Sequence, residues 1–368
     1  MNIRLFYHSV ISDWNNGHAH FLRGVVTELV SRGHDVVVLE PVDSWSLRML
    51  VQEHGEGVID EFREAFPAVS VKRFESLGLI NELADADVVI VHEWNDPALV
   101  AELGHLRAAG AGFRLLFHDT HHRAVSEPNA MEAFDLRHFD GALVFGDVLR
   151  RIYLERGWAR NVWTWHEAAD ARLFHPCPGV RKNLDLVWVG NWGDGERTEE
   201  LHEFLIEPVR RLGLRAEVYG VRYEPSAVRA LARAGIAYRG RIANADVPKT
   251  FARARVTVHV PRRPYASQLP GIPTIRPFEA MACGIPLVSG PWQDTGDLFR
   301  PGVDFLFASD GVEMERHLSG ILADPDYANS LAAAGRETIL RRHTCAHRVD
   351  ELLGVVRSLE PAGELVAG

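Results

Sequence analysis

The sequence alternates short apolar runs with segments of helical periodicity from one end to the other. Runs such as 88–92 (VVIVH) and 184–189 (LDLVWV) are typical of strands that are buried in a parallel sheet. The stretches between such runs, for example 20–32 and 99–109, have the apolar spacing of amphipathic helices. A chain that repeats strand and helix in this way is expected to form α/β layers, and its 46% hydrophobic content suffices for a large core.

The strand-like runs form two series, which predicts two doubly wound, Rossmann-like parallel sheets. The runs of the first series are 3–7, 35–39, 88–92, 114–118, 141–145 and 161–165, and those of the second are 184–189, 215–219, 237–240, 256–260, 286–289 and 304–307. Between the two series lies 174–183 (FHPCPGVRKN), whose prolines and glycine are typical of a linker.

We therefore expect an N-terminal domain over residues 1–175 and a C-terminal domain over residues 176–345. Residues 346–368 are expected to form a helix that packs back toward the N-terminal domain. Two such domains facing across a cleft would place a ligand at the carboxyl ends of the strands.

Composition excludes several classes of protein. A net charge of −10, with acidic and basic residues mixed along the chain, argues against a general nucleic-acid binder. The three cysteines are too widely spaced for a disulfide framework or a zinc pattern. The N-terminal segment lacks the apolar core of a signal peptide, and no run approaches membrane-spanning length. We expect a cytoplasmic protein without a nucleic-acid partner or a membrane span.

One carboxylate, Glu279, stands in the otherwise apolar segment 274–290 (TIRPFEAMACGIPLVSG). The segment predicts a helix that is opened by Pro277 and ended by Gly284. Backbone amides at the helix start, with the Arg276 guanidinium, could hold a phosphate, and a first-turn carboxylate could accept hydrogen bonds from a ribose diol. Alternatively, Glu279 only complements the helix dipole and Arg276 pairs with a surface acid.

A glycine-rich turn, 189–197 (VGNWGDGER), follows the first strand of the second series. Such a turn lets the backbone approach a pyrophosphate, and a helix is expected to begin near Arg197. Arg197 could contact the diphosphate or lie on the surface of that helix. Arg262 and Arg263, which follow the strand 256–260, are candidate phosphate or acceptor contacts, and a solvated pair explains them equally well.

Histidine and aspartate side chains end the fourth predicted strand, in 115–124 (LLFHDTHHRA). Close spacing of such residues can hold a metal ion, and the candidates are His118, Asp119, His121 and His122. We expect no metal site, because no ligand cluster in another segment accompanies them. Packing is the alternative role for His121 and His122.

Several segments together resemble the retaining GT-B glycosyltransferases of the family 4 type. RPFEAMACGIPLV is similar to their donor-binding segment, and NNGHAHFLRGVVTELVSRGHDVVVLE is similar to their first strand–helix unit, with Gly17 in its glycine loop. ADARLFHP matches their Asp-x-x-x-Phe-x-Pro signature through Asp170, Phe174 and Pro176. With GNWGDGER and HTCAHR, the chain looks most similar to the spore-maturation-type, CgeB-like branch. The resemblance covers most of the chain.

The resemblance implies an enzyme that moves a hexosyl or related group from a nucleotide diphosphate sugar to an acceptor. It further implies retention of configuration, with no metal or other cofactor beyond that co-substrate. As catalytic residues it places His118 against the donor sugar and Arg197 on the diphosphate. The residues implied to bind the donor are Gly17, Gly190, Asn191, Arg241, Ile242, Thr274, Ile275, Arg276 and Glu279. His18 and His20 would border the acceptor and the phosphates, with packing as the alternative for His20.

One position departs from the family pattern. The family carries a second acid eight residues before the ribose glutamate, where it contacts the donor sugar, and this chain has Gly271 there. The sugar contacts would then come from elsewhere, for example from Gln268 or the backbone amides of 271–274. Two other functions therefore stay open: a nucleotide-sugar epimerase or hydrolase on the same fold, and a non-catalytic nucleotide-sugar-binding protein.

Overall fold

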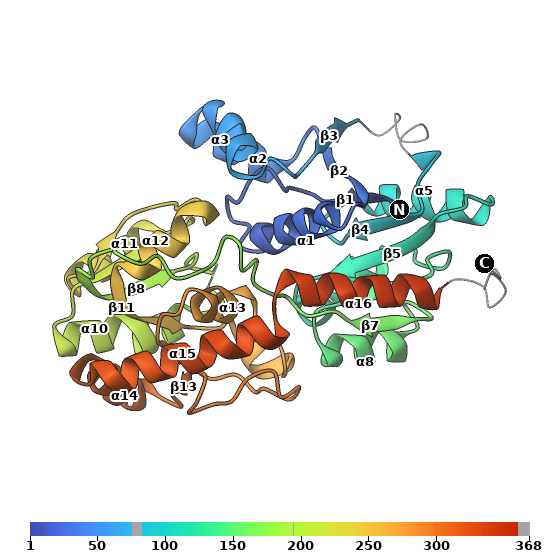
Figure 1. Ribbon diagram of the computed structural model, residues 1–368. Coiled ribbons are helices and arrows are strands. Elements are labelled where there is room, and N and C mark those ends of the chain that lie inside the picture. The colour runs from blue at the N-terminus through green and yellow to red at the C-terminus, as the bar shows by residue number, and fades with distance from the viewer. Residues whose placement is uncertain (76–82, 194, 360–368) are drawn as a thin grey trace. The chain divides into compact units, whose positions relative to one another are not determined.

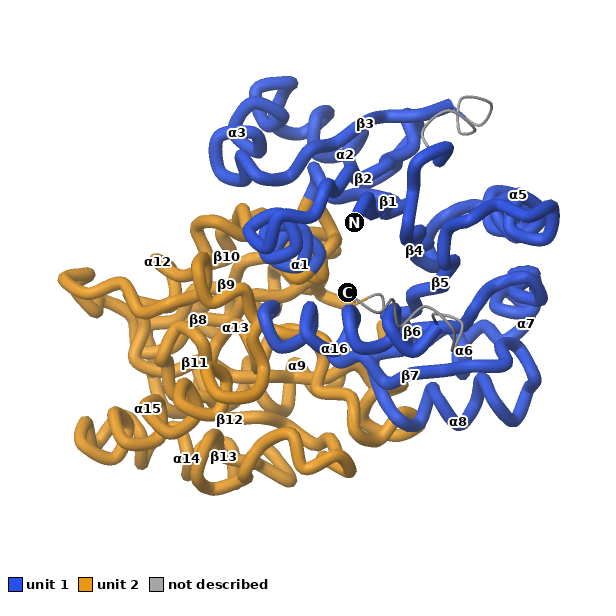
Figure 2. Tube along the Cα trace, turned by 45° about the vertical axis from the view of Figure 1, so that its right-hand side comes forward, with its two compact units in different colours: residues 1–12, 22–166, 345–368 blue, residues 13–21, 167–344 orange. Residues whose placement is uncertain are grey.

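The computed structural model describes residues 1–75, 83–193 and 195–359, so the last part of the helix predicted over 346–368, residues 360–368, lies outside the described residues. The chain divides into two compact units (Figure 2). Unit 1 comprises 1–12, 22–166 and 345–368, and unit 2 comprises 13–21 and 167–344. Each unit has one parallel sheet, which confirms the predicted pair of doubly wound α/β domains.

Unit 1 is built on a seven-stranded sheet with the order β3-β2-β1-β4-β5-β6-β7 (Figure 1). Its strands are β1 Asn2–Phe6, β2 Asp35–Pro41, β3 Val71–Phe74, β4 Val88–His92, β5 Arg114–Asp119, β6 Gly141–Val144 and β7 Val162–Thr164. Its helices are α1 Ala19–Ser31, α2 Trp45–His54, α3 Gly57–Ala65, α5 Pro97–Ala108, α6 Arg123–Ser126, α7 Pro128–Glu132, α8 Asp147–Arg156 and α16 Cys345–Ser358. Every residue of β4 is buried, which accounts for its uninterrupted apolar sequence.

Unit 2 is built on a six-stranded sheet with the order β10-β9-β8-β11-β12-β13. Its strands are β8 Leu184–Val189, β9 Ala216–Tyr219, β10 Ala237–Tyr238, β11 Ala254–His259, β12 Leu287–Ser289 and β13 Leu306–Phe307. Its helices are α9 Thr198–Leu201, α10 Glu207–Leu212, α11 Pro225–Arg233, α12 Val247–Ala252, α13 Ile275–Ala282, α14 Gly311–Ala323 and α15 Pro325–Arg342, with π-helical turns at His202–Ile206 and Pro264–Gln268 and a 3₁₀ turn at Asn244–Asp246.

Alternate residues of β8 belong to different parts of the core of unit 2. Leu186 and Trp188 lie in one apolar cluster, whereas Val187 and Val189 lie in another. Successive strand residues point to opposite faces, so helices cover both faces of this sheet. Among the described residues, no helix is both long and apolar enough to cross a membrane.

All twelve predicted strands are present, with ends that shift by a few residues. The sequence analysis missed β3, because VKRF has no apolar run and lies half exposed at the edge of the sheet. Edge strands face water along one side, so their sequences carry little of the pattern that identifies a buried strand.

The grouping of residues differs from the predicted domain boundaries. The chain passes into unit 2 after His166 instead of after residue 175, because Ala169 donates its N–H to the His343 carbonyl and Phe174 packs in the core of unit 2. Helix α16 groups with unit 1, where the Trp165 indole N–H donates to the Arg348 carbonyl at 2.8 Å.

Helix α13, which carries the predicted donor residues, is held by close packing against α15. Gly335 of α15 lies so near α13 that a Cβ there would be 3.0 Å from Met281 Cγ and 2.5 Å from the Asp304 carbonyl oxygen. At its end, Gly284 has a φ of +66°, and Gly284 and Ile285 donate their N–H groups to Met281 and Ala280. These are the bonds of a Schellman motif, as the sequence predicts for the end of this helix.

We expect Gly335→Ala to lower the stability of the protein by about 1–3 kcal/mol, because the added methyl group overlaps the Asp304 carbonyl. Thermal and urea unfolding of the full chain would measure this. Gly320→Ala is the matched control: Gly320 lies in α14 with nothing within 4 Å of an added Cβ, and a helical alanine there should stabilise by up to about 1 kcal/mol. Equal stability of the two variants would contradict the close approach of Gly335 to Asp304 and Met281.

Candidate functional site

Glycines and polar side chains gather at the carboxyl ends of β8 and β9 in unit 2. A Cβ on Gly220 would lie 2.1 Å from the Gly190 carbonyl oxygen, so only glycine permits the approach of the two strand ends. The Asn191 side-chain oxygen accepts the Val221 N–H at 3.0 Å and fixes this edge. The carboxyl edge is where parallel sheets bind ligands.

A hollow with about 360 Å³ of empty space, part of it open to solvent, lies at this edge. The predicted donor residues Gly17, Gly190, Asn191, Arg241, Ile242 and Arg276 all line it. Its other lining residues are Asp13, Asn15, Asn16, Val189, Gly220, Val221, Asn244 and Val247. The structure therefore brings together, within one unit, segments that are far apart in the sequence.

The start of α13 differs from the prediction. The helix begins at Ile275 and not at Pro277, so Glu279 lies beyond its first turn. The first four N–H groups of a helix lack partners within it, so Pro277 is tolerated at the third position. Thr274 precedes the helix with a φ of 59°, a left-handed conformation that costs energy in a β-branched residue. The dipole argument for Glu279 is therefore wrong, and its environment comes from other contacts.

Glu279 is a fully buried carboxylate held by two basic side chains. Its Oε1 lies 2.8 Å from His20 Nδ1, and its Oε2 accepts a hydrogen bond from Arg276. Burial raises the pKa of Glu279, but Arg276 and His20 together outweigh that effect and hold the pKa below its usual value. Glu279 is therefore a fixed, ionised acceptor at neutral pH. The packing role expected as the alternative for His20 also applies, since its ring lies 4.4 Å from that of Phe174.

Arg197 is held at the ends of β8 and β11. Its guanidinium donates to the Val260 carbonyl at 2.9 Å and to the Asn191 carbonyl, and it lies 5.1 Å from the Trp188 ring centre. Burial lowers the pKa of Arg197 to about 9, with the charges of Arg262 and Arg276 acting in the same direction. Arg197 therefore stays protonated at neutral pH as a cation whose position is set by backbone.

The remaining candidates of unit 2 pair with acids. Arg262 lies 2.8 Å from Glu196, and the exposed Arg263 lies 2.7 Å from Glu200. His18 Nδ1 lies 2.5 Å from Glu167 Oε1.

The family has an acid at the position of Gly271. The backbone conformation at Gly271 does not suit an acid. Its φ is +91°, and a Cβ there would lie 2.5 Å from Thr295 Oγ1. A side chain at this position would have to displace Thr295 and strain the backbone. The departure from the family pattern is therefore built into the surrounding structure.

His259, which the sequence analysis missed, ends β11 and is almost fully buried. Its Nδ1 lies 2.9 Å from Ser289 Oγ, and that hydroxyl donates to the Gly290 carbonyl, so Nδ1 must carry the ring proton. Burial lowers the pKa of His259 to about 3, and the charges of Arg197 and Arg276 lower it further. The buried Nε2 has no hydrogen-bond partner among the described residues. The neutral His259 ring thus places a hydrogen-bond acceptor near the charges of Arg197 and Arg276. The signal available in the sequence was the position of His259 at the end of a predicted strand.

His118, the other predicted catalytic residue, belongs to unit 1. It lies on β5 opposite His92 of β4, is fully buried, and its ring centre is 4.8 Å from that of Trp165. Arg197 and Glu279 belong to unit 2, so the predicted catalytic residues are divided between the units.

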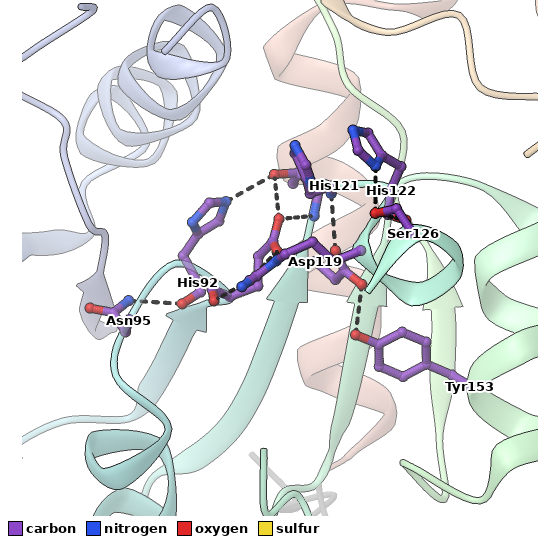
Figure 3. Close-up of polar contacts among 10 residues, drawn as sticks. His92, Asn95, Asp119, His121, His122, Ser126 and Tyr153 are labelled. Atoms are coloured by element: carbon purple, nitrogen blue, oxygen red, sulfur yellow. Dashed lines mark hydrogen bonds and ion pairs between the residues drawn. The ribbon is translucent and has the colours of Figure 1, made fainter. Parts of the chain in front are cut away.

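The residues that follow His118 bind different partners (Figure 3). Asp119 accepts hydrogen bonds from the Tyr153 hydroxyl at 2.7 Å and from the His121 N–H at 3.0 Å, whereas His122 Nδ1 lies 2.8 Å from Ser126 Oγ. These contacts tie the carboxylate and the histidines into the loop that follows β5. The absence of a metal stays a prediction.

Asp119 also interacts with Glu93, at the end of β4. Burial and the Asp119 charge raise the pKa of Glu93 to about 8, although Arg123 opposes this with an ion pair of 2.6 Å. Burial likewise raises the pKa of Asp119. This polar cluster joins the ends of β4 and β5 in unit 1, where Glu93 also accepts the Thr120 N–H at 3.1 Å.

The low pKa of His259 has a measurable consequence. Between its ordinary pKa of 6.5 and about 3, the unfolded chain binds a proton at this ring that the folded protein does not. The contribution of His259 to stability is therefore lost as pH falls through this window, by about 1.4 kcal/mol per pH unit. We expect His259→Gln to show a shallower loss of stability between pH 6.5 and 4 than wild type. His54→Gln, at an exposed histidine, is the control, and equal slopes for wild type and His259→Gln would show that the ring is not held neutral.

Residues 197–354 match the family model described as Glycosyl transferase-like. The matched region includes Arg197, Arg241, His259 and all of α13. No curated protein is significantly similar to this sequence.

Solved structures share the fold of the whole chain. Sucrose-phosphate synthase (tll1590) from Thermosynechococcus elongatus is 15% identical, with a TM-score of 0.68 over 98% of this chain and 99% of that chain. Anabaena Alr3699/HepE in complex with UDP-glucose is 14% identical, with a TM-score of 0.69 over 97% and 100%. An alpha-glucosyltransferase in complex with UDP and a 13-mer DNA containing an HMU base is 12% identical, with a TM-score of 0.69 over 97% and 99%.

At these identities the likeness shows the fold, which is the predicted GT-B fold of glycosyltransferases. The family match, to a model described as Glycosyl transferase-like, covers residues 197–354, which contain most of unit 2. Both findings support the enzyme class expected from the sequence: the chain has the GT-B fold, and its residues 197–354 match the model of a glycosyl transferase-like family.

Proposed function

We propose that the protein is a glycosyltransferase that transfers a sugar from a nucleoside diphosphate sugar to an acceptor. The observation that carries the proposal is the set of charges in unit 2. The hollow at the carboxyl edge of its sheet is lined by Arg276, whose partner Glu279 is a buried, ionised carboxylate. Arg197 stands on the same strand ends, in the region that matches the glycosyl transferase-like family.

In this proposal the guanidiniums of Arg197 and Arg276 hold the diphosphate, together with the amides at the start of α13. Glu279 accepts hydrogen bonds from the ribose hydroxyls, and the backbone at Arg241 and Ile242 contacts the base. The bond from the sugar anomeric carbon to the diphosphate oxygen breaks while the bond to the acceptor oxygen forms. The acceptor proton passes to the leaving diphosphate oxygen on the same face, which retains the configuration. Arg197 and Arg276 stabilise the negative charge that grows on the diphosphate.

Several parts of the proposal rest on the resemblance alone. These are the retaining course, the spore-maturation-type branch, the place of His118 beside the sugar, and independence from metal ions. For the last, two arginines can neutralise a diphosphate without a cation. A cytoplasmic location also stays a prediction from the sequence.

For the donor, we propose a UDP-sugar as the first to test, because solved neighbours were crystallised with UDP or UDP-glucose. One neighbour was solved with DNA, but the net charge of −10 of this chain favours an acceptor other than nucleic acid. The family match does not favour an epimerase, a hydrolase or a non-catalytic binding protein.

A binding screen followed by product analysis tests the function. Nucleoside diphosphates and their sugars are added to the full chain, and a ligand at 100 times its Kd should stabilise it by about 2.7 kcal/mol. The stabilising sugar donor is then incubated with and without acceptors of different chemistry, and the products are identified by mass spectrometry. Transfer to an acceptor supports the proposal. Donor consumption that no acceptor changes would indicate the epimerase or hydrolase, and no binding of any nucleoside diphosphate would overturn the proposal.

We expect Glu279→Gln to weaken binding of the nucleoside diphosphate found in the screen by about 1.5–3 kcal/mol, because it removes a charged acceptor from the ribose. Isothermal titration calorimetry on the folded variant would measure this. Glu217→Gln is the matched control: Glu217 is another buried carboxylate of unit 2, but its partner at 2.7 Å is Arg239, which does not line the hollow, whereas Glu279 pairs with the lining residue Arg276. If both variants bind as wild type does, the ribose role of Glu279 is wrong.

His118→Ala should lower kcat on the order of 100-fold and leave the Kd of the bare diphosphate nearly unchanged, because its contact with the sugar would strengthen only in the transition state. Steady-state kinetics and calorimetry on the same preparation separate the two quantities.

A chelator should leave wild-type activity unchanged. Activity that is lost on chelation and restored by one divalent metal would instead assign the histidine to a metal site, and a near-normal kcat would remove it from the mechanism.

A further inference from the structure

Residues 13–21, which we call the strap, come from the N-terminal part of the sequence but group with unit 2. Four of them, Asp13, Asn15, Asn16 and Gly17, line the hollow of unit 2. The strap therefore forms part of the wall of the site that we propose for the donor, and its contacts there are specific.

The firmest contact is an ion pair between Asp13 and Arg241. The Arg241 guanidinium donates to Asp13 Oδ1 from Nη2 at 2.6 Å and from Nε at 3.2 Å, and both side chains are largely buried. Asp13 Oδ2 accepts the Asn244 N–H at 2.9 Å. The Asp13 carboxylate thus accepts hydrogen bonds from the Arg241 guanidinium and the Asn244 backbone amide. Guanidinium and amide donors of this kind bind anions.

The rest of the strap contacts the same wall. Asn15, with a φ of 51°, accepts a hydrogen bond from the Asn191 side chain at 2.5 Å. Gly17 lies so near Arg276 that a Cβ there would be 3.0 Å from Nη2. At the end of the strap, His20 holds Glu279. Arg241, Arg276 and Glu279, the charged groups implied to bind the donor, each have a strap residue against them.

We propose that the strap is an internal occupant of the hollow, and that the Asp13–Arg241 ion pair holds it there in competition with a nucleoside diphosphate. This inference rests on the proposed function. Binding of the ligand displaces the strap and releases Asp13 from the Arg241 guanidinium. The contacts of Asn15 and Gly17 then have to rearrange, because both residues line the same space.

The test is the affinity of Asp13→Asn for UDP, measured by isothermal titration calorimetry on the full chain. Asparagine keeps the size of the side chain but removes the charge that holds Arg241, so the Kd should fall about five- to tenfold. Asp185→Asn is the matched control, because it breaks another Asp–Arg pair of unit 2, with Arg215, outside the hollow. Its Kd should equal that of wild type. An Asp13→Asn variant that binds UDP as wild type does, or more weakly, overturns the competition.

Asn15→Ala provides a second variant, in case Asp13→Asn does not fold. It removes the bond to Asn191 and loosens the strap without touching the ion pair, so its UDP affinity should also rise, by a smaller factor. Weaker binding by Asn15→Ala would overturn the inference.

Hydrogen exchange of residues 13–21 gives a readout that does not depend on affinity. UDP should speed exchange of these amides in wild type, and Asp13→Asn should exchange faster without any ligand. Slower exchange on adding UDP would mean that the strap closes over the ligand, which overturns the competition while leaving the donor site intact. If UDP and the other nucleoside diphosphates bind neither wild type nor variant, the proposed function is wrong. The proposed displacement of the strap by such a ligand is then wrong as well.

Discussion

The buried carboxylate of Glu279 is the interaction on which the site in unit 2 depends. An ionised carboxylate without contact with water is costly, and here Arg276 and His20 offset that cost. Arg276 lies three residues before Glu279 in α13, whereas His20 comes from the end of the strap and joins that segment to the helix. The packing of Gly335 against Met281 supports the helix that carries the carboxylate. The charge of Glu279 therefore links helix α13 to the strap.

The same site holds several guanidiniums close to one another, which would repel without compensation. Asp13 neutralises Arg241, Glu279 neutralises Arg276, and backbone carbonyls accept from Arg197. His259 adds no further charge, because burial keeps its ring neutral. An entering diphosphate would find Arg197 and Arg276 already in position, so the reorganisation needed would be the displacement of the strap. This balance gives the strap its importance in the proposed binding step.

The fold follows from the sequence because burial and periodicity are local properties. Val88–His92 and Leu184–Val189 have the bounds that the apolar runs predicted, since such runs are buried on both faces of their sheets. The strand Val71–Phe74 was missed, because an edge strand needs no apolar run. The π-helical turn at His202–Ile206 gives no periodic signal of its own, so the sequence predicted a helix that begins near Arg197 but not the π turn within it.

The sequence by itself determined which residues lie at the carboxyl edge of the second sheet, because glycines and polar residues that follow strands reach that edge in any parallel fold. Gly190 was predicted for the site on this basis, Arg276 from its place at a helix start, and Gly17 through the resemblance, and all three line one hollow. Only the tertiary structure decided the partners. Asp13 and Arg241 are 228 residues apart, and no local pattern in either segment specifies the other. The start of α13, the neutral state of His259 and the fit of Gly271 against Thr295 likewise depend on neighbours from distant segments, which only the folded chain brings into contact.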